Sequence, residues 1–144
     1  MPIRTRDTEI ITRISVYCDE IMEAIVRFGN SFEVLEKDDV YRDGMAMRVY
    51  QISELAQHLT ADFTLSYGNM PWHLIKGLRV VFAHRYGTLD KKILWKTISE
   101  RVPELKKFCT EILAKAAVSA LSPRDKADTP SDDSPSRSVK PGKQ

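Results

Sequence analysis

The stretch DVYRDGMAMRVYQISELAQHL, residues 39–59, does most to decide the fold of this 144-residue chain. Its apolar residues recur mostly at the three- and four-residue spacing of an α-helix. One stripe consists of Tyr41, Met45, Ile52, Ala56 and Leu59, and a second consists of Val40, Met47 and Tyr50. Apolar residues on two faces predict a helix that lies at the centre of a bundle and packs against several neighbours.

Helical periodicity continues on both sides of this segment. We expect further helices over residues 7–28, 31–37, 71–87 and 90–101, and from Pro103 onward. Residues 61–70 contain a Gly-Asn turn signal and are expected to form a loop. The alternation typical of a strand is not sustained anywhere. The prediction is therefore an all-α fold, an antiparallel up-and-down helical bundle.

Composition and charge narrow the class of protein. Apolar residues make up 42% and charged residues 29% of the chain, as in globular domains. The net charge is +2, from 22 basic and 20 acidic residues, so a histone-like nucleic-acid binder is excluded. No apolar run approaches the roughly 18 residues of a membrane span, and the N-terminus does not resemble a signal peptide. We expect a cytoplasmic protein that contacts no membrane.

The end of the chain differs from the rest. Residues 122–144 are rich in proline, serine and charged residues, and Val139 is their one branched apolar residue. Such a segment buries too little to offset its ordering entropy, which predicts a disordered tail. The folded domain is expected over residues 5–121. Within it, Cys18 and Cys109 have no C-x-x-C neighbour and are expected to be free, buried thiols; no spacing of ligand residues indicates a metal site.

The helix expected over residues 71–87, PWHLIKGLRVVFAHRYG, contains an arginine in an unusual position. Arg79 shares one helix face with Trp72, Ile75, Phe82 and Tyr86. A guanidinium among large apolar side chains needs an anion, because an isolated buried charge is very costly. Two explanations remain open. Arg79 forms a structural ion pair with Glu54 of the 39–59 segment, or it faces a cleft and binds a phosphate.

His84 lies five residues after Arg79, which on an ideal helix corresponds to about 140° of rotation and about 7.5 Å of rise. The two side chains therefore do not meet well on one straight helix. Either the helix frays near His84, which Gly87 would allow, or two copies of the helix surround one cleft in a symmetric dimer. His58 and His73 are expected to have no catalytic role.

Arg79, His84 and Tyr86 form an R-x4-H-x-Y pattern that resembles the motif of HEPN-domain proteins, in particular HepT-type ribonuclease toxins. The similarity extends over about residues 7–115. It includes the I-S-E-L-A sequence at residues 52–56, and Trp72 and Gly77 before the motif. One position departs from the family pattern. Family members usually carry a polar residue, often Asn, directly after the arginine, and this chain has Val80.

The resemblance implies a metal-independent, cofactor-free endoribonuclease that acts on mRNA or tRNA as a homodimer. His84 would act as general base or acid on the ribose 2′-hydroxyl, Arg79 would stabilise charge on the phosphoryl oxygens, and Glu54 is a candidate supporting residue. The implied product is a 2′,3′-cyclic phosphate, and DNA is not an expected substrate because it lacks the 2′-hydroxyl. Tyr86 would be AMPylated by a minimal nucleotidyltransferase (MNT) antitoxin.

The sequence around the motif is locally basic. Basic residues crowd the motif and the helix after it: Lys76, Arg79, Arg85, Lys91, Lys92 and Lys96. They form either a track for RNA phosphates or an ordinary solvated face.

The first alternative function is a non-catalytic HEPN subunit that binds a nucleotide or substrate for a nucleotidyltransferase. The second is a dimeric helical scaffold.

Overall fold

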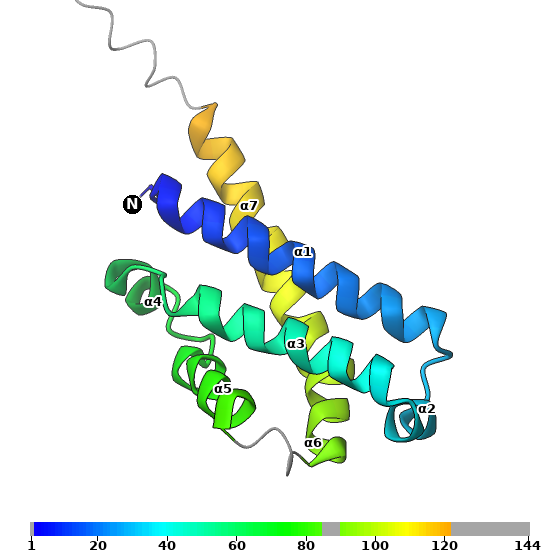
Figure 1. The fold of residues 1–144 in the computed structure, drawn as a ribbon. Helices are drawn as coiled ribbons and strands as arrows, with labels where there is room; N and C mark the ends of the chain where they lie inside the picture. Colours follow the sequence, from blue (N-terminus) through cyan, green and yellow to red (C-terminus); the bar gives the residue numbers. More distant parts are fainter. Residues whose placement is uncertain (1, 85–89, 122–144) are drawn as a thin grey trace, which may run out of the picture.

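The computed structural model describes residues 2–84 and 90–121. Over those residues all regular structure is helical, which confirms the predicted fold class (Figure 1). The elements are α1 (Thr5–Arg27), α2 (Phe32–Lys37), α3 (Asp39–Ala56), α4 (Ala61–Ser66), α5 (Trp72–His84), α6 (Lys91–Lys96), a π-helical segment η2 (Thr97–Arg101) and α7 (Val102–Ala120). The expected tail at 122–144 and the expected helix end near Gly87 lie outside the described residues.

Helix α3 has the central place that its sequence predicts. It packs against α1 on one side and α5 on another, and α7 packs along α1 (Figure 1). The first predicted stripe of α3 is buried throughout: Tyr41, Met45, Ile52, Ala56 and Leu59. The second stripe is not, because Val40 is 78% and Met47 55% exposed. Further buried apolar residues of α3 lie outside both stripes: Ala46, Val49 and Leu55.

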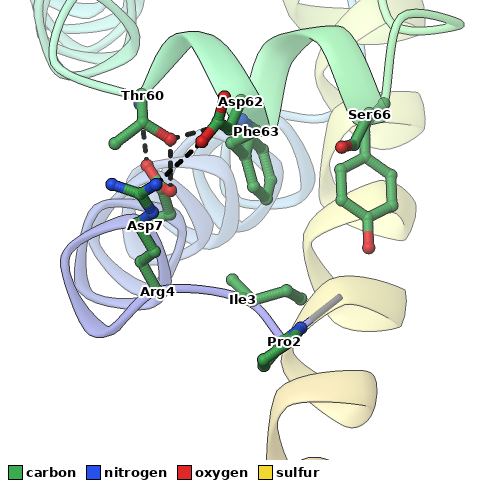
Figure 2. A pocket seen from close by; sticks show the side chains of 9 residues that line it. Pro2, Ile3, Arg4, Asp7, Thr60, Asp62, Phe63 and Ser66 are labelled. Carbon is green, nitrogen blue, oxygen red and sulfur yellow. Dashed lines mark hydrogen bonds and ion pairs between the residues drawn. The ribbon is translucent and has the colours of Figure 1, made fainter.

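The prediction of a loop over residues 61–70 is wrong, because that segment begins with α4. Thr60 caps the helix, and its Oγ1 accepts a hydrogen bond from the Phe63 N–H at 3.2 Å. Buried Asp7 of α1 holds Thr60 in turn: the Thr60 N–H donates to Oδ1 at 2.9 Å and its hydroxyl to Oδ2 at 2.7 Å (Figure 2). A six-residue helix fixed from 53 positions away leaves little periodic signal in the sequence.

The break expected between residues 101 and 103 is also absent. Asp90 caps α6 and accepts hydrogen bonds from the N–H groups of Lys92 and Ile93. The helical path then continues through η2 into α7. Pro103 has no N–H to donate to the Ser99 carbonyl four residues before it. The wider π-helical turn immediately upstream accommodates the proline. Pro103 therefore changes the winding of the helix without ending it.

The two cysteines of the domain lie in its core. Cys18 and Cys109 are free and fully buried, as predicted. Burial raises the pKa of both thiols, that of Cys109 to about 12, so neither forms a thiolate near neutral pH. Among the residues that the structure describes, no helix is long and apolar enough to cross a bilayer.

The Asp7–Thr60 contact gives a stability prediction. We expect Asp7→Ala to lower the free energy of unfolding by about 1–3 kcal/mol, because two donors of Thr60 lose their buried acceptor. Asp62→Ala is the matched control. Its carboxylate pairs with Arg4 at 2.7 Å, but both side chains are more than 60% exposed, so its loss should cost less than about 1 kcal/mol. Urea unfolding followed by circular dichroism measures both; equal losses would contradict the role assigned to Asp7.

Candidate active site

Helix α5 is fixed to the bundle at both ends of its apolar face. It begins directly after Pro71, whose carbonyl accepts from the N–H groups of Leu74 and Ile75. Trp72 is buried against Phe108, and its Nε1–H donates to the Tyr67 carbonyl at 3.0 Å. Phe82 is buried at the other end of the helix. The helix face that contains Arg79 is therefore turned toward the rest of the bundle.

The C-cap residue of α3, Gln57, also binds the backbone of α5. Gln57 Nε2 donates to the Lys76 carbonyl at 3.0 Å. The same amide lies 3.5 Å from the Ser53 carbonyl of its own helix. This bridge joins the two helices one turn before Arg79, so the distance from α3 to the arginine is closely set.

Arg79 and Glu54 form the ion pair that the sequence offered as one explanation. Arg79 Nη1 lies 3.9 Å from Glu54 Oε2, and the two side chains are 45% and 31% exposed. The contact is long for a charge-assisted hydrogen bond, which is typically about 2.7–2.9 Å. Nearly half of the Arg79 side chain faces solvent. The sequence analysis treated two explanations of Arg79 as alternatives: a structural ion pair with Glu54 and an accessible guanidinium that binds an anion. The structure is compatible with both at once.

Tyr50 is a third member of this cluster, and the sequence analysis missed it. Its hydroxyl donates to Glu54 Oε2 at 2.9 Å, the same oxygen that faces Arg79. This hydrogen bond to a carboxylate raises the pKa of the Tyr50 phenol, and the positive charge of Arg79 acts in the opposite direction. Counting Tyr50 as part of an apolar stripe hid this role. Its i,i+4 spacing from Glu54 was the available signal.

The other predicted site residues lie farther along the chain. The α-helix continues through His84, so it does not fray before that residue, and positions 79 and 84 are separated by about 140° around the axis. The side chain of His84 and all of Tyr86 and Arg85 lie outside the described residues. Over the part of the chain that is described, no three His, Cys, Asp or Glu side chains gather as metal ligands.

Exposed residues extend the surface around Arg79. Val80, which stands where the resembling proteins usually have a polar residue, is exposed. His73 and His58 are exposed as well. Of the basic residues in the expected track, Lys91, Lys92 and Lys96 are exposed and Lys76 is half-buried. Cationic side chains are therefore available on α6 to an anionic ligand.

The sequence profile described as "Ribonuclease HepT-like" matches residues 14–112, which include all of α3 and α5. This chain belongs to the HepT-like ribonuclease family. RNA is thus the substrate class of its family.

Individual relatives agree with the profile. A protein of Caldanaerobacter subterraneus subsp. tengcongensis named "Putative RNase" is 33% identical over 68% of this chain and 86% of its own length. A "Putative RNase" of Methanocaldococcus jannaschii is 38% identical over 39% of this chain and 51% of that protein. A "Probable ribonuclease HepT" of Thermococcus cleftensis is 33% identical over 38% and 50%, respectively. No solved structure gives a significant match.

The Tyr50–Glu54 contact predicts a pH-dependent signal. In Glu54→Ala, the pKa of the Tyr50 phenol should fall toward its ordinary value of 10.0, because the carboxylate that favours the protonated hydroxyl is gone. Ultraviolet absorbance of the tyrosinate, or NMR of ring-labelled tyrosine, follows the titration, and Tyr50→Phe identifies which signal belongs to Tyr50. A titration of Tyr50 that is the same in wild type and Glu54→Ala would contradict the contact.

Proposed function

We propose that this chain is a metal-independent endoribonuclease toxin of the cytoplasm. It cuts mRNA or tRNA in a cleft shared by two subunits, and a nucleotidyltransferase antitoxin neutralises it by AMPylating Tyr86. The observation that carries the proposal is the position of Arg79, the first residue of the family motif. The arginine is half-exposed at the α3–α5 contact and only loosely engaged by Glu54 at 3.9 Å. A phosphate can therefore reach the guanidinium without an ion pair having first to be fully broken.

The proposed reaction uses only the RNA and two kinds of side chain. His84 accepts the proton of a ribose 2′-hydroxyl, whose oxygen attacks the adjacent phosphorus. The bond from phosphorus to the 5′-oxygen breaks, and that oxygen takes up a proton. The products are a 2′,3′-cyclic phosphate and a 5′-hydroxyl end. Arg79 stabilises the charge that develops on the non-bridging oxygens. Histidine suits both proton transfers because it changes charge near neutral pH.

Helix geometry supports the proposed dimer. Since α5 remains helical through His84, one subunit presents positions 79 and 84 about 140° apart. Two copies related by a two-fold axis place two arginines and two histidines around one cleft. One imidazole can then accept a proton while the other donates one. The exposed apolar residues Met47 and Val80, on the two helices that contain Glu54 and Arg79, are suited to burial in such a contact.

The proposed control acts by charge. An AMP group on Tyr86 places a negatively charged phosphodiester seven residues after Arg79 on the same predicted helix face. Two such residues are nearly two helical turns apart. The added phosphate would compete with RNA for the guanidinium and repel the RNA backbone.

The alternative function is a non-catalytic HEPN subunit that binds a nucleotide or substrate for a separate nucleotidyltransferase. Exposed Val80 favours it, because the polar residue usual at this position in resembling proteins is missing next to Arg79. Under this alternative Arg79 anchors a phosphate and His84 transfers no proton. RNA cleavage by the purified protein separates the two functions.

We expect Arg79→Ala and His84→Ala each to reduce RNA cleavage by at least about 100-fold, the scale of losing one charge-stabilising or acid–base group. Gel assays on total RNA, with mass spectrometry of the ends, measure both the rate and the predicted cyclic phosphate. His73→Ala is the matched control, because this exposed histidine lies on the same helix outside the motif. If wild-type protein leaves every RNA intact, or if His73→Ala is equally impaired, the nuclease proposal fails.

The shared cleft requires a dimer in solution. Multi-angle light scattering of the wild-type protein should give twice the chain mass of 16.5 kDa, and Met47→Asp should shift it toward the monomer by burying a charge in the proposed contact. Val118→Asp is the control and should remain dimeric, because Val118 is an exposed apolar residue on α7, away from the proposed contact. A monomeric wild type that still cleaves RNA would refute the shared-cleft mechanism.

The antitoxin proposal predicts a covalent change. Incubation with a nucleotidyltransferase encoded beside this chain, together with ATP, should add one or more AMP groups and abolish RNA cleavage. Intact-mass measurement detects the addition, and peptide sequencing locates it. Tyr86→Phe should remain unmodified, whereas Tyr67→Phe, a tyrosine on another helix end, should be modified as wild type. Modification of the Tyr86→Phe protein would show that the target lies elsewhere.

A further inference from the structure

We propose that Tyr50 is a positioning residue for the arginine of the site: through Glu54 it sets where the guanidinium of Arg79 stands and how much of it is left free for a phosphate. This inference rests on the proposed nuclease function, and it adds to the motif a residue that lies 29 positions before Arg79 on a different helix.

The contact geometry singles out one oxygen atom. Glu54 Oε2 accepts the Tyr50 hydroxyl at 2.9 Å and faces Arg79 Nη1 at 3.9 Å. A carboxylate left to itself would pair with an arginine through two parallel, short hydrogen bonds. Here the phenol already occupies the oxygen nearest the guanidinium. A carboxylate oxygen can accept a second hydrogen bond, so the phenol acts by holding the carboxylate in its present orientation, in which the charged pair is close but not tightly bonded.

The backbone of α5 gives this arrangement its precision. Gln57 fixes the Lys76 carbonyl to α3 at 3.0 Å, three residues before Arg79. With the two helices joined there, the guanidinium can adjust only through its own side chain and through the carboxylate that faces it. Tyr50 and Glu54 of α3 and its C-cap residue Gln57 share one side, at i, i+4 and i+7 spacing. Glu54 and Gln57 contact α5, and Tyr50 contacts Glu54. Of the two adjustable groups, the arginine side chain and the carboxylate, Tyr50 acts on the carboxylate.

Charge balance explains why a neutral donor suits this place. A lysine or arginine at position 50 would compete with Arg79 for the negative charge of Glu54. A residue without a donor would leave Glu54 free to form the tight pair with Arg79. The phenol donates one hydrogen bond and adds no charge, so Glu54 keeps its negative charge beside Arg79. A phenol is neutral across the physiological range at its ordinary pKa of 10.0, and the hydrogen bond to Glu54 raises the pKa of Tyr50 further.

Kinetics of RNA cleavage test the effect on the reaction. Tyr50→Phe should lower kcat by about fivefold or more, the factor that one hydrogen bond of typical net strength supplies, with a smaller change in KM. Glu54→Gln should lower kcat as well. Because Tyr50 acts through Glu54, the double variant should be no slower than Glu54→Gln alone. Additive losses in the double variant would overturn the inference.

The matched controls remove comparable groups away from Arg79. Tyr67→Phe deletes a phenol hydroxyl at the end of α4, and Glu20→Gln neutralises the carboxylate that binds Arg48 Nε at 2.9 Å between α1 and α3. Both should leave kcat within about twofold of wild type, a difference below about half a kcal/mol. Circular dichroism confirms folding of every variant. A loss of kcat in the controls equal to that in Tyr50→Phe would overturn a specific role for Tyr50.

A spectroscopic measurement makes the inference independent of the nuclease activity. Side-chain ¹⁵N NMR reports the position and order of the Arg79 guanidinium, with Arg79→Lys identifying its signal. Tyr50→Phe and Glu54→Gln should both shift the Arg79 Nε–H resonance and change its order parameter, and Tyr67→Phe should do neither. If wild type cleaves no RNA but these shifts occur, the nuclease proposal fails and the positioning contact stands. If Arg79 gives the same signal in wild type and Tyr50→Phe, the positioning role is refuted.

Discussion

The packing of α5 against α3 is the contact on which the candidate site depends. Trp72 and Phe82 are buried at the two ends of α5, so the helix cannot rotate about its axis without exposing one of them. Arg79 lies between them on the same face and is therefore held at the edge of an apolar contact. A cation in that place needs a nearby negative charge, and Glu54 of α3 supplies it at 3.9 Å. Burial of aromatic rings thus determines the position of a charged group.

The long distance of 3.9 Å between Arg79 and Glu54 bears on both the stability of the fold and the proposed function. An exposed ion pair of this length contributes little to folding. It also leaves donors of the guanidinium available, which is what a phosphate-binding arginine requires. The Tyr50 hydroxyl lies 2.9 Å from the same carboxylate oxygen. This contact is consistent with a site that keeps the guanidinium available to a ligand at the expense of a stabilising ion pair. In the proposed ribonuclease reaction, the free donors of the guanidinium bind the RNA phosphate.

The sequence was least informative where structure depends on single distant contacts or on helix winding. Helix α4 exists because Thr60 caps it and buried Asp7 holds Thr60, and neither contact has a periodic pattern. The continuous path from α6 to α7 exists because η2 accommodates Pro103, a residue that ordinarily indicates a helix boundary. On α3, periodicity predicted the buried Met45 stripe correctly but also assigned burial to Val40 and Met47, which are largely exposed.

The sequence by itself determined the all-helical class and the buried main stripe of α3, because these depend on short-range spacing and residue type. Short-range spacing also carries the resemblance of Arg79, His84 and Tyr86 to the motif of HepT-type proteins, and the chain belongs to the HepT-like ribonuclease family. The sequence also named Glu54 as a partner of Arg79. Only the tertiary structure decided that this pair is long and half-exposed and that Tyr50 shares its oxygen. The reason is physical: spacing along one helix fixes directions around its axis, whereas distances of a few ångströms between two helices are set by the side chains that pack between them.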